Sequence, residues 1–259
     1  MKVMAGLFDS HTHLNADWIM KDLEAVCKRI EESEIEYVMN VAFDLESSYT
    51  AIKQAERFDW CYASVGCHPH DAKGMDDATL LLMKGLTKKP KVKAVGEIGL
   101  DFHYDHSPRD VQRHWFRKQI QMAREVNLPI IIHDREAHEE TMNILKEEGA
   151  FEGKVLMHCY SGSTEMAKQY VKLGAMLSIP GTITYKNAKK QVEVVKSIPL
   201  ENLLIETDAP YLTPEPFRGK RNEPSYLKYT AEKIAEILEM NFGELAKATN
   251  ENARRFFDI

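Results

Sequence analysis

The sequence predicts an α/β protein, a (β/α)8 TIM barrel that forms a single domain over residues 1–259. Three observations predict this fold. Short apolar runs alternate with longer segments of helical period, and eight such pairs recur about every 30 residues, as expected for a barrel of this length. The apolar runs are continuous, which is typical of parallel strands covered on both faces. An open doubly wound sheet is the alternative, but no G-x-G-x-x-G follows the first run.

The expected strands are these apolar runs. The first, 6–13, ends in His11-Thr12-His13, and side chains two positions apart in a strand point the same way. The fifth, 129–133, is the most apolar and ends at His133. The remaining strands are expected at 37–42, 61–66, 92–97, 155–158, 175–179 and 203–208.

The segments between the strands have apolar residues at helical intervals. The first such segment is 18–33. Ser107 and Pro108 open a helix with a cap and a proline at the first helical position, and Ser163 caps a later helix. Further helices are expected at 45–58, 76–86, 137–148, 188–197 and 224–238, with a final helix ending near 256–257.

Charge and cysteine content limit the possible functions. The net charge of -6 gives no overall basic field for nucleic acid, so a polyanionic substrate needs a local basic patch and bound metal. The four cysteines show no paired spacing, and we expect reduced thiols in a cytoplasmic protein. No apolar run has the length of a membrane span, so no membrane is expected as a partner.

Candidate metal ligands stand at the carboxyl ends of five expected strands. In a (β/α)8 barrel these ends meet at one mouth, where active sites lie. Packing does not explain the placement, because a histidine at a strand end gains nothing from burial without a partner. The candidates are His11, His13, Glu97, His133, His158 and Asp208.

Each candidate taken alone also has an ordinary structural interpretation. His133 can be a core histidine, His158 can bond a loop, and Asp208 can form a turn. All six together favour a metal site. Four imidazoles and two carboxylates exceed one tetrahedral ion and suit two divalent ions, Mg²⁺, Mn²⁺ or Zn²⁺, with Glu97 as the bridge. Asp208 is either a ligand that also accepts a proton or a ligand alone.

Seven motifs resemble the TatD family of metal-dependent hydrolases, within the amidohydrolase superfamily. The resemblance runs almost end to end, and the order and number of the motifs make it specific. Asn15 and Tyr160 depart from the family pattern, which has aspartate and phenylalanine there, and neither is a proposed ligand. The motifs are FDSHTHL, GCHPH, GEIGLD, HDREA, HCYSG, ETDAPYL and RGKRNEP, which begin at residues 8, 66, 96, 133, 158, 206 and 218.

The resemblance implies a two-metal centre and a deoxyribonuclease that trims DNA from the 3′ end. It places His11, His13, Glu97 and Asp208 around one ion, and Glu97, His133 and His158 around the other. The predicted reaction is attack on a phosphodiester by a hydroxide that the two metals activate, with Asp208 and Glu97 as catalytic residues. DNA is the expected substrate, and no obligate protein partner is implied.

Several residues near the ligands are candidates for binding phosphate. His68 and His70 flank Pro69 after the third strand, although a rigid turn with solvent-facing histidines is the alternative. Arg135 follows His133 and can clamp a phosphate or form a salt bridge at a helix start. Tyr104 or Tyr211 can stack on a base or simply pack. The compact basic cluster after the eighth strand consists of Arg218, Lys220 and Arg221.

Two other functions compete with the nuclease. The first is hydrolysis of small esters, amides or lactones on the same binuclear centre, because fold and metals alone do not fix the substrate. The second is a non-catalytic protein with a structural metal. The full set of six ligands argues against the second.

Overall fold

The computed structural model describes residues 6–259. Its eight strands form one sheet in the order β1 to β8. Strand β1 (Leu7–Thr12) also lies against β8 (Leu203–Ile205), because the Ser10 hydroxyl donates to the carbonyl oxygen of Ile205 at 2.9 Å. Beyond the end of β8, the amide of Asp208 donates to the carbonyl oxygen of His11. The predicted (β/α)8 TIM barrel is confirmed.

The other elements alternate along the chain as the sequence pattern predicts. The remaining strands are β2 (Ile35–Asn40), β3 (Cys61–Val65), β4 (Val92–Asp101), β5 (Ile130–Arg135), β6 (Val155–Met157) and β7 (Met176–Ile179). The α-helices are α1 (Asp17–Met20), α2 (Leu23–Glu31), α3 (Leu45–Arg57), α4 (Asp77–Leu86), α5 (Arg109–Val126), α6 (His138–Glu147), α7 (Thr164–Lys172), α8 (Lys189–Ser197), α9 (Leu227–Ile237) and α10 (Phe242–Phe257). Short 3-10 helices include η1 (Ala72–Gly74), η3 (Gly181–Thr184) and η5 (Pro224–Tyr226).

Contacts between residues in space divide the chain into two compact units. The first unit comprises the described residues up to Met39, together with Cys159–Lys172 and Met176–Ile259. The second comprises Asn40–His158 and Leu173–Ala175. That residues 1–259 act as one domain stays a prediction.

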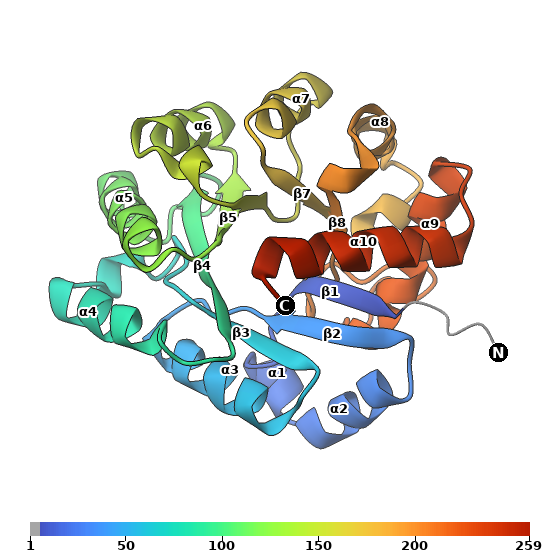
Figure 1. Cartoon of the computed structure of the whole chain (residues 1–259), viewed down its shortest axis with the longest axis horizontal. Helices are drawn as coiled ribbons and strands as arrows, with labels where there is room; N and C mark the ends of the chain where they lie inside the picture. The colour runs from blue at the N-terminus through green and yellow to red at the C-terminus, as the bar shows by residue number, and fades with distance from the viewer. Residues whose placement is uncertain (1–5) are drawn as a thin grey trace. The chain divides into compact units, whose positions relative to one another are not determined.

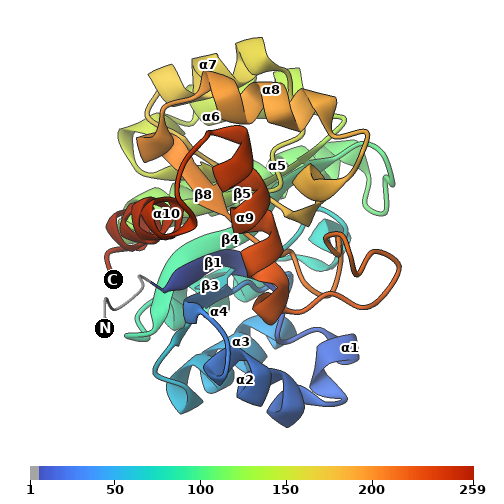
Figure 2. The same ribbon diagram turned by 90° about the vertical axis from the view of Figure 1, so that its right-hand side faces the viewer.

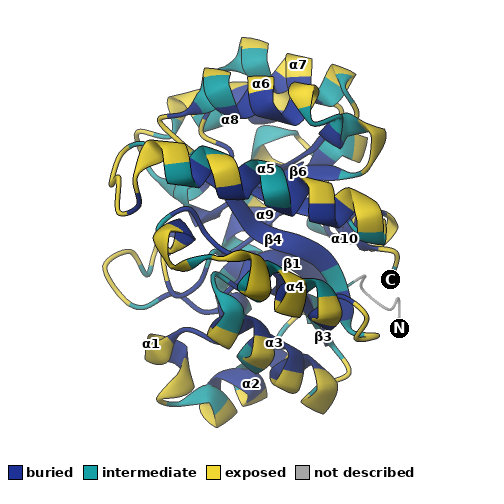
Figure 3. Cartoon of the chain, turned by 90° about the vertical axis from the view of Figure 1, so that its left-hand side faces the viewer, coloured by how far each residue is buried: buried dark blue, intermediate teal, exposed yellow. Residues whose placement is uncertain are grey.

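The core of the first unit lies between β1 and the last helices. Phe8 on β1 stacks on Phe257 of α10 with ring centroids 5.8 Å apart, and both rings are buried. Helix α10 runs beside β1, with α9 as its neighbour (Figures 1 and 2). Buried and exposed residues alternate along α10, as expected for a helix with one face on a sheet (Figure 3). Burial of each ring contributes about 2 kcal/mol.

The core of the second unit is built around β4, which is longer than predicted. The sequence predicts a strand at 92–97 followed by a loop, but β4 runs on to Asp101 and is buried along most of its length (Figure 3). The strand continues because β5 also extends to Arg135, so that Gly99 pairs with His133 and Asp101 with Arg135. Glu97 therefore lies inside a strand and not at its end.

Three local predictions are wrong for identifiable reasons. Segment 18–33 forms two helices, because Asp22 leaves the helical region (φ −142°, ψ 35°) and its carboxylate binds Arg221. Ser107 does not cap α5, since its hydroxyl donates to the carbonyl oxygen of His70 and accepts from the amide of Lys73. Strand β8 ends at Ile205, three residues before Asp208.

Two further features concern a helix cap and the length of the apolar helices. Ser163 accepts a hydrogen bond from the amide of Met166, so its predicted role as a helix cap is confirmed. Among residues 6–259, no helix combines the length and the apolar composition needed to cross a membrane.

Candidate metal centre

The first ligand group, His11, His13 and Asp208, lies in the first unit. Alternation along β1 turns both imidazoles to the same side, and their Nε2 atoms are 3.1 Å apart. Asp208 Oδ1 lies 3.8 Å from His11 Nε2 and 3.4 Å from His13 Nε2. Ligand atoms about 2.1 Å from a shared divalent ion are about 3.0 to 3.4 Å apart in octahedral or tetrahedral geometry. Two of the three separations lie in this range and the third exceeds it by about 0.4 Å, so a small movement of Asp208 brings all three atoms around one divalent ion.

Asp208 reaches the histidines from a turn with unusual backbone geometry. Its φ of 53° is in the left-handed region, which costs a residue with a side chain about 1 kcal/mol and which aspartate tolerates better than most. The amide of Asp208 donates to the carbonyl oxygen of His11, and its own carbonyl oxygen accepts from the amide of Tyr211, both at 2.9 Å. These bonds fix the turn beside the end of β1.

Asp9 connects β1 to the residue before Asp208. Its Oδ1 accepts hydrogen bonds from the amides of Thr207 (2.9 Å) and His11 (3.3 Å), and its Oδ2 accepts from the Thr207 hydroxyl at 2.5 Å. Complete burial raises the pKa of Asp9 to about 8, because lost hydration outweighs these hydrogen bonds. Sequence reasoning missed Asp9, although it lies two residues before His11.

The second ligand group, Glu97, His133 and His158, lies in the second unit. Glu97 Oε1 is 2.7 Å from His133 Nδ1 and 2.8 Å from His158 Nε2, and the carboxylate is almost fully buried. A Cβ on Gly96 would lie 2.7 Å from the Cβ of Ile131, so only glycine lets β4 approach β5 closely here. One carboxylate oxygen thus serves two imidazoles.

Asp101 fixes the orientation of His133 from the other side of the ring. Asp101 Oδ2 is 3.2 Å from His133 Nε2 and 2.8 Å from His70 Nε2, and its Oδ1 accepts from the amides of His103 and Tyr104. Burial opposes ionisation of Asp101, but these bonds hold its pKa well below the usual range. A carboxylate on the second ring nitrogen is the usual support of a metal-binding histidine. Asp101 lies in the GEIGLD motif, but the sequence pattern alone predicts no role for it.

The same bonds decide the protonation of His133. Burial lowers its pKa, but hydrogen bonds to Asp101 and Glu97 outweigh that effect and raise it to about 9. A metal ion at Nδ1 must therefore displace a proton at neutral pH.

His68 is held as a hydrogen-bond donor beside the second ligand group. Its Nε2 lies 3.6 Å from Glu97 Oε1, and His68, Glu97 and His133 offer ligand atoms within 4.8 Å of one another. However, His68 Nδ1 accepts a hydrogen bond from the amide of His70 at 3.1 Å. In the neutral ring the hydrogen then sits on Nε2, which faces Glu97. This tautomer suits donation to a substrate oxygen better than metal binding.

The predicted phosphate-binding cations differ in their surroundings. Arg218 and Lys220 are exposed and lie over the rings of Tyr185 and Phe217. Arg135, also exposed, lies over Tyr104 at 4.6 Å. Arg221 instead forms two hydrogen bonds with Asp22, at 2.6 and 2.8 Å, and a third with the carbonyl oxygen of Trp18. Phosphate binding by these cations, and by His68 and His70, stays a prediction.

Comparison with known proteins identifies the family of this fold and ligand set. A sequence model of the family described as "TatD related DNase" matches residues 8–258. The chain belongs to this TatD family. The resemblance predicted from the motifs is confirmed.

Two relatives and one solved structure of the TatD family match over nearly their whole length. YabD of Bacillus subtilis, named an uncharacterized metal-dependent hydrolase, is 52% identical over 253 residues, 98% of this chain and 99% of the relative. TatD of Erwinia tasmaniensis, named a 3′-5′ ssDNA/RNA exonuclease, is 32% identical over 98% of this chain and 100% of the relative. The crystal structure of the TatD homologue YjjV from Escherichia coli superposes with a TM-score of 0.93 at 29% identity, covering 99% and 100% of the two chains. The chain is a metal-dependent hydrolase of the TatD family.

Proposed function

We propose that this hydrolase is a deoxyribonuclease that removes nucleotides from the 3′ end of DNA. The observation that carries the proposal is the first ligand group, whose ligand atoms lie 3.1 to 3.8 Å apart at the strand ends where barrel enzymes have their active sites. The family description, TatD related DNase, and the name of the Erwinia relative support the choice of substrate.

The proposed centre combines both ligand groups in one domain. The carboxyl ends of all strands in a (β/α)8 barrel open on the same mouth, which supports joining the two groups. In this proposal two divalent ions, Mg²⁺, Mn²⁺ or Zn²⁺, are bound by the two sets of residues. One set is His11, His13, Glu97 and Asp208, and the other is Glu97, His133 and His158.

The side chains act around a substrate phosphate in distinct ways. When bound, the ions neutralise charge on the phosphate oxygens and lower the pKa of a water molecule. Asp208 Oδ1 accepts the proton of the attacking water, and Glu97 Oε1 keeps His133 and His158 aligned. The Nε2 hydrogen of His68 donates to a phosphate oxygen. Further phosphate contacts come from His70, Arg135, Arg218, Lys220 and Arg221, the last after exchanging Asp22 for phosphate.

The test is a direct assay of the purified protein with Mg²⁺, Mn²⁺ or Zn²⁺. The substrates are 5′-labelled single- and double-stranded DNA, beside a panel of small esters, amides and lactones. We expect products that shorten from the 3′ end, with no cleavage in a chelator or by Asp208→Asn, which keeps the wild-type circular dichroism spectrum. Full activity in the chelator contradicts the metal mechanism. Hydrolysis of the esters without cleavage of DNA assigns the centre to the alternative substrates.

A further inference from the structure

Asn222, which the proposed function does not use, lies buried beside the turn that carries Asp208. Its Nδ2 donates to the carbonyl oxygens of Thr207 (2.8 Å) and Tyr211 (2.6 Å). Its backbone amide donates to the carbonyl oxygen of Pro210 at 3.1 Å. One side-chain amide therefore spans the turn and binds a carbonyl oxygen on each side of Asp208.

These bonds act on a segment that does not follow regular strand or helix geometry. Asp208 and Leu212 both have φ near 54°, in the left-handed region. A chain in this conformation persists only where its surroundings hold it. The Asn222 amide supplies such a constraint, because two carbonyl oxygens are fixed by one rigid planar group.

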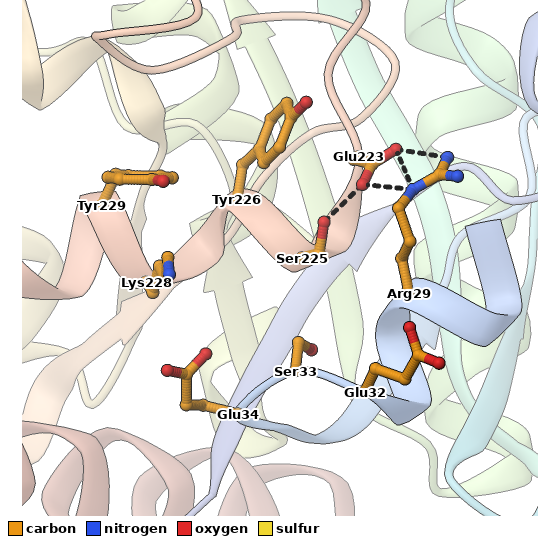
Figure 4. Close-up of a pocket in the computed structure, with 9 residues that line it drawn as sticks. All are labelled: Arg29, Glu32, Ser33, Glu34, Glu223, Ser225, Tyr226, Lys228 and Tyr229. Carbon is orange, nitrogen blue, oxygen red and sulfur yellow. Dashed lines mark hydrogen bonds and ion pairs between the residues drawn. The ribbon is translucent and has the colours of Figure 1, made fainter. Parts of the chain in front are cut away.

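The neighbours of Asn222 are anchored to the region around α2. Arg221 binds both carboxylate oxygens of Asp22. Glu223 accepts hydrogen bonds from Arg29 Nε (2.8 Å) and Nη2 (2.6 Å), and from Ser225, beside a groove of about 510 Å³ (Figure 4). The Glu223–Arg29 pair, which the proposed function leaves intact, therefore holds residues 221–223 in place and fixes the backbone from which the Asn222 side chain reaches the turn.

We propose that Asn222 is a positioning residue for Asp208. By holding the turn on both sides, it keeps Asp208 Oδ1 within reach of the Nε2 atoms of His11 and His13. This inference deepens the proposed function, since it rests on the role given there to Asp208. It predicts that Asn222 controls metal binding by the first ligand group without touching the metal.

The chain offers a matched control in Asn252 on α10. This asparagine is also buried, and its Nδ2 also donates to two carbonyl oxygens, those of Leu200 (2.7 Å) and Leu203 (3.0 Å). Those carbonyl groups stand at the beginning of β8, whereas Asn222 acts beyond its end. Asn252→Ala therefore removes an equivalent pair of side-chain hydrogen bonds at the opposite end of the same strand.

The experiment compares Asn222→Ala, Asn222→Ser and Asn252→Ala with the wild type. We expect Asn222→Ala to bind Mn²⁺ about 10- to 100-fold more weakly by calorimetry and to lose kcat on DNA by a similar factor, with KM nearly unchanged. Asn222→Ser keeps one donor and should fall between. Asn252→Ala should lower the melting temperature about as much, but change Mn²⁺ affinity and kcat by less than about twofold.

Hydrogen exchange provides a readout that needs neither metal nor DNA. In the chelated protein, the amides of Asp208 and Tyr211 should exchange faster in Asn222→Ala than in the wild type or in Asn252→Ala. If the wild type binds Mn²⁺ but leaves DNA intact, the nuclease proposal fails while the affinity and exchange tests still decide the role of Asn222. The positioning role is overturned if Asn222→Ala, or Asn222→Ser where the alanine variant does not fold, matches Asn252→Ala in every measurement.

Discussion

The two ligand groups differ in how the protein positions their side chains for a cation. In the first, the ligand atoms stand 3.1, 3.4 and 3.8 Å apart, and the two shorter separations are those expected around a shared ion. In the second, Glu97 Oε1 lies at 2.7 and 2.8 Å from two imidazole nitrogens, and Asp101 holds the far side of His133. In the first group the backbone of β1 and of the turn at Asp208 brings the side chains together, and the two imidazoles share a hydrogen bond between their Nε2 atoms. In the second group two carboxylates hold the imidazoles by hydrogen bonds. The proton on His133 is therefore part of the second group and must leave when a metal ion binds at Nδ1.

The largest expected effect tests how far the second group depends on one carboxylate. Glu97→Gln leaves His133 and His158 without their shared negative partner, and we expect kcat to fall at least about 10³-fold. Metal titration should show weakened binding of both ions, because the proposal places Glu97 on each. Asp208→Asn should instead spare the ion of the second group. Equal metal stoichiometry in both variants would contradict the proposal that Glu97 binds both ions and Asp208 only one.

A smaller effect on metal affinity is expected from replacing Asp101, the carboxylate that supports His133. Asp101→Asn replaces the oxygen that orients the ring, and we expect Mn²⁺ affinity to fall about 10- to 100-fold. Asp134→Asn is the matched control, because Asp134 Oδ2 binds His138 Nδ1 at 2.9 Å in another aspartate–histidine pair of the same unit. The control should change affinity by less than about twofold. If the two variants behave alike, Asp101 has only a structural role.

The smallest effect concerns pH and follows from the proton on His133. Its pKa of about 9 lies above the ordinary 6.5, so the protonated ring stabilises the folded protein below pH 6.5, and this contribution is lost as pH rises through 9. In chelator, the melting temperature should therefore decline over that interval, and His133→Gln should flatten the decline.

Metal binding should show the opposite trend with pH. Affinity at the second group should rise about tenfold per pH unit until about pH 9, with one proton released per ion near neutrality. Calorimetry in two buffers of different ionisation enthalpy measures that release. Binding without proton release would contradict the protonated state of His133.

The barrel and the candidate ligands could be predicted because both depend on local patterns. Continuous apolar runs and helical periods give the order of elements, and histidines at run ends indicate one mouth. The strand ends are less accurate. Glu97 and His133 lie inside their strands, because β4 and β5 pair as far as Asp101 and Arg135, and Asp208 lies three residues beyond the end of β8. The length of a strand depends on its neighbour, which the strand's own sequence does not contain.

The supporting residues could not be predicted, because their partners are distant in the sequence. Asp9 binds Thr207 across 198 positions, and Asp101 binds His133 across 32. Arg221 has the charge of a phosphate ligand, yet its partner in the structure is Asp22. No spacing rule links such residues, although Asp9, Asp101 and Asn222 all lie inside the motifs that carry the family resemblance.

The left-handed backbone at Asp208 lowers the free energy of unfolding at a residue that the proposed reaction requires. Glycine adopts that conformation at no steric cost, so Asp208→Gly should relax the chain while deleting a candidate ligand. Laboratory evolution that selects only for a folded protein at high temperature should therefore enrich glycine at position 208. The selected barrels should be thermally stable but inactive. A screen that also scores turnover should retain the aspartate and collect its stabilising changes elsewhere.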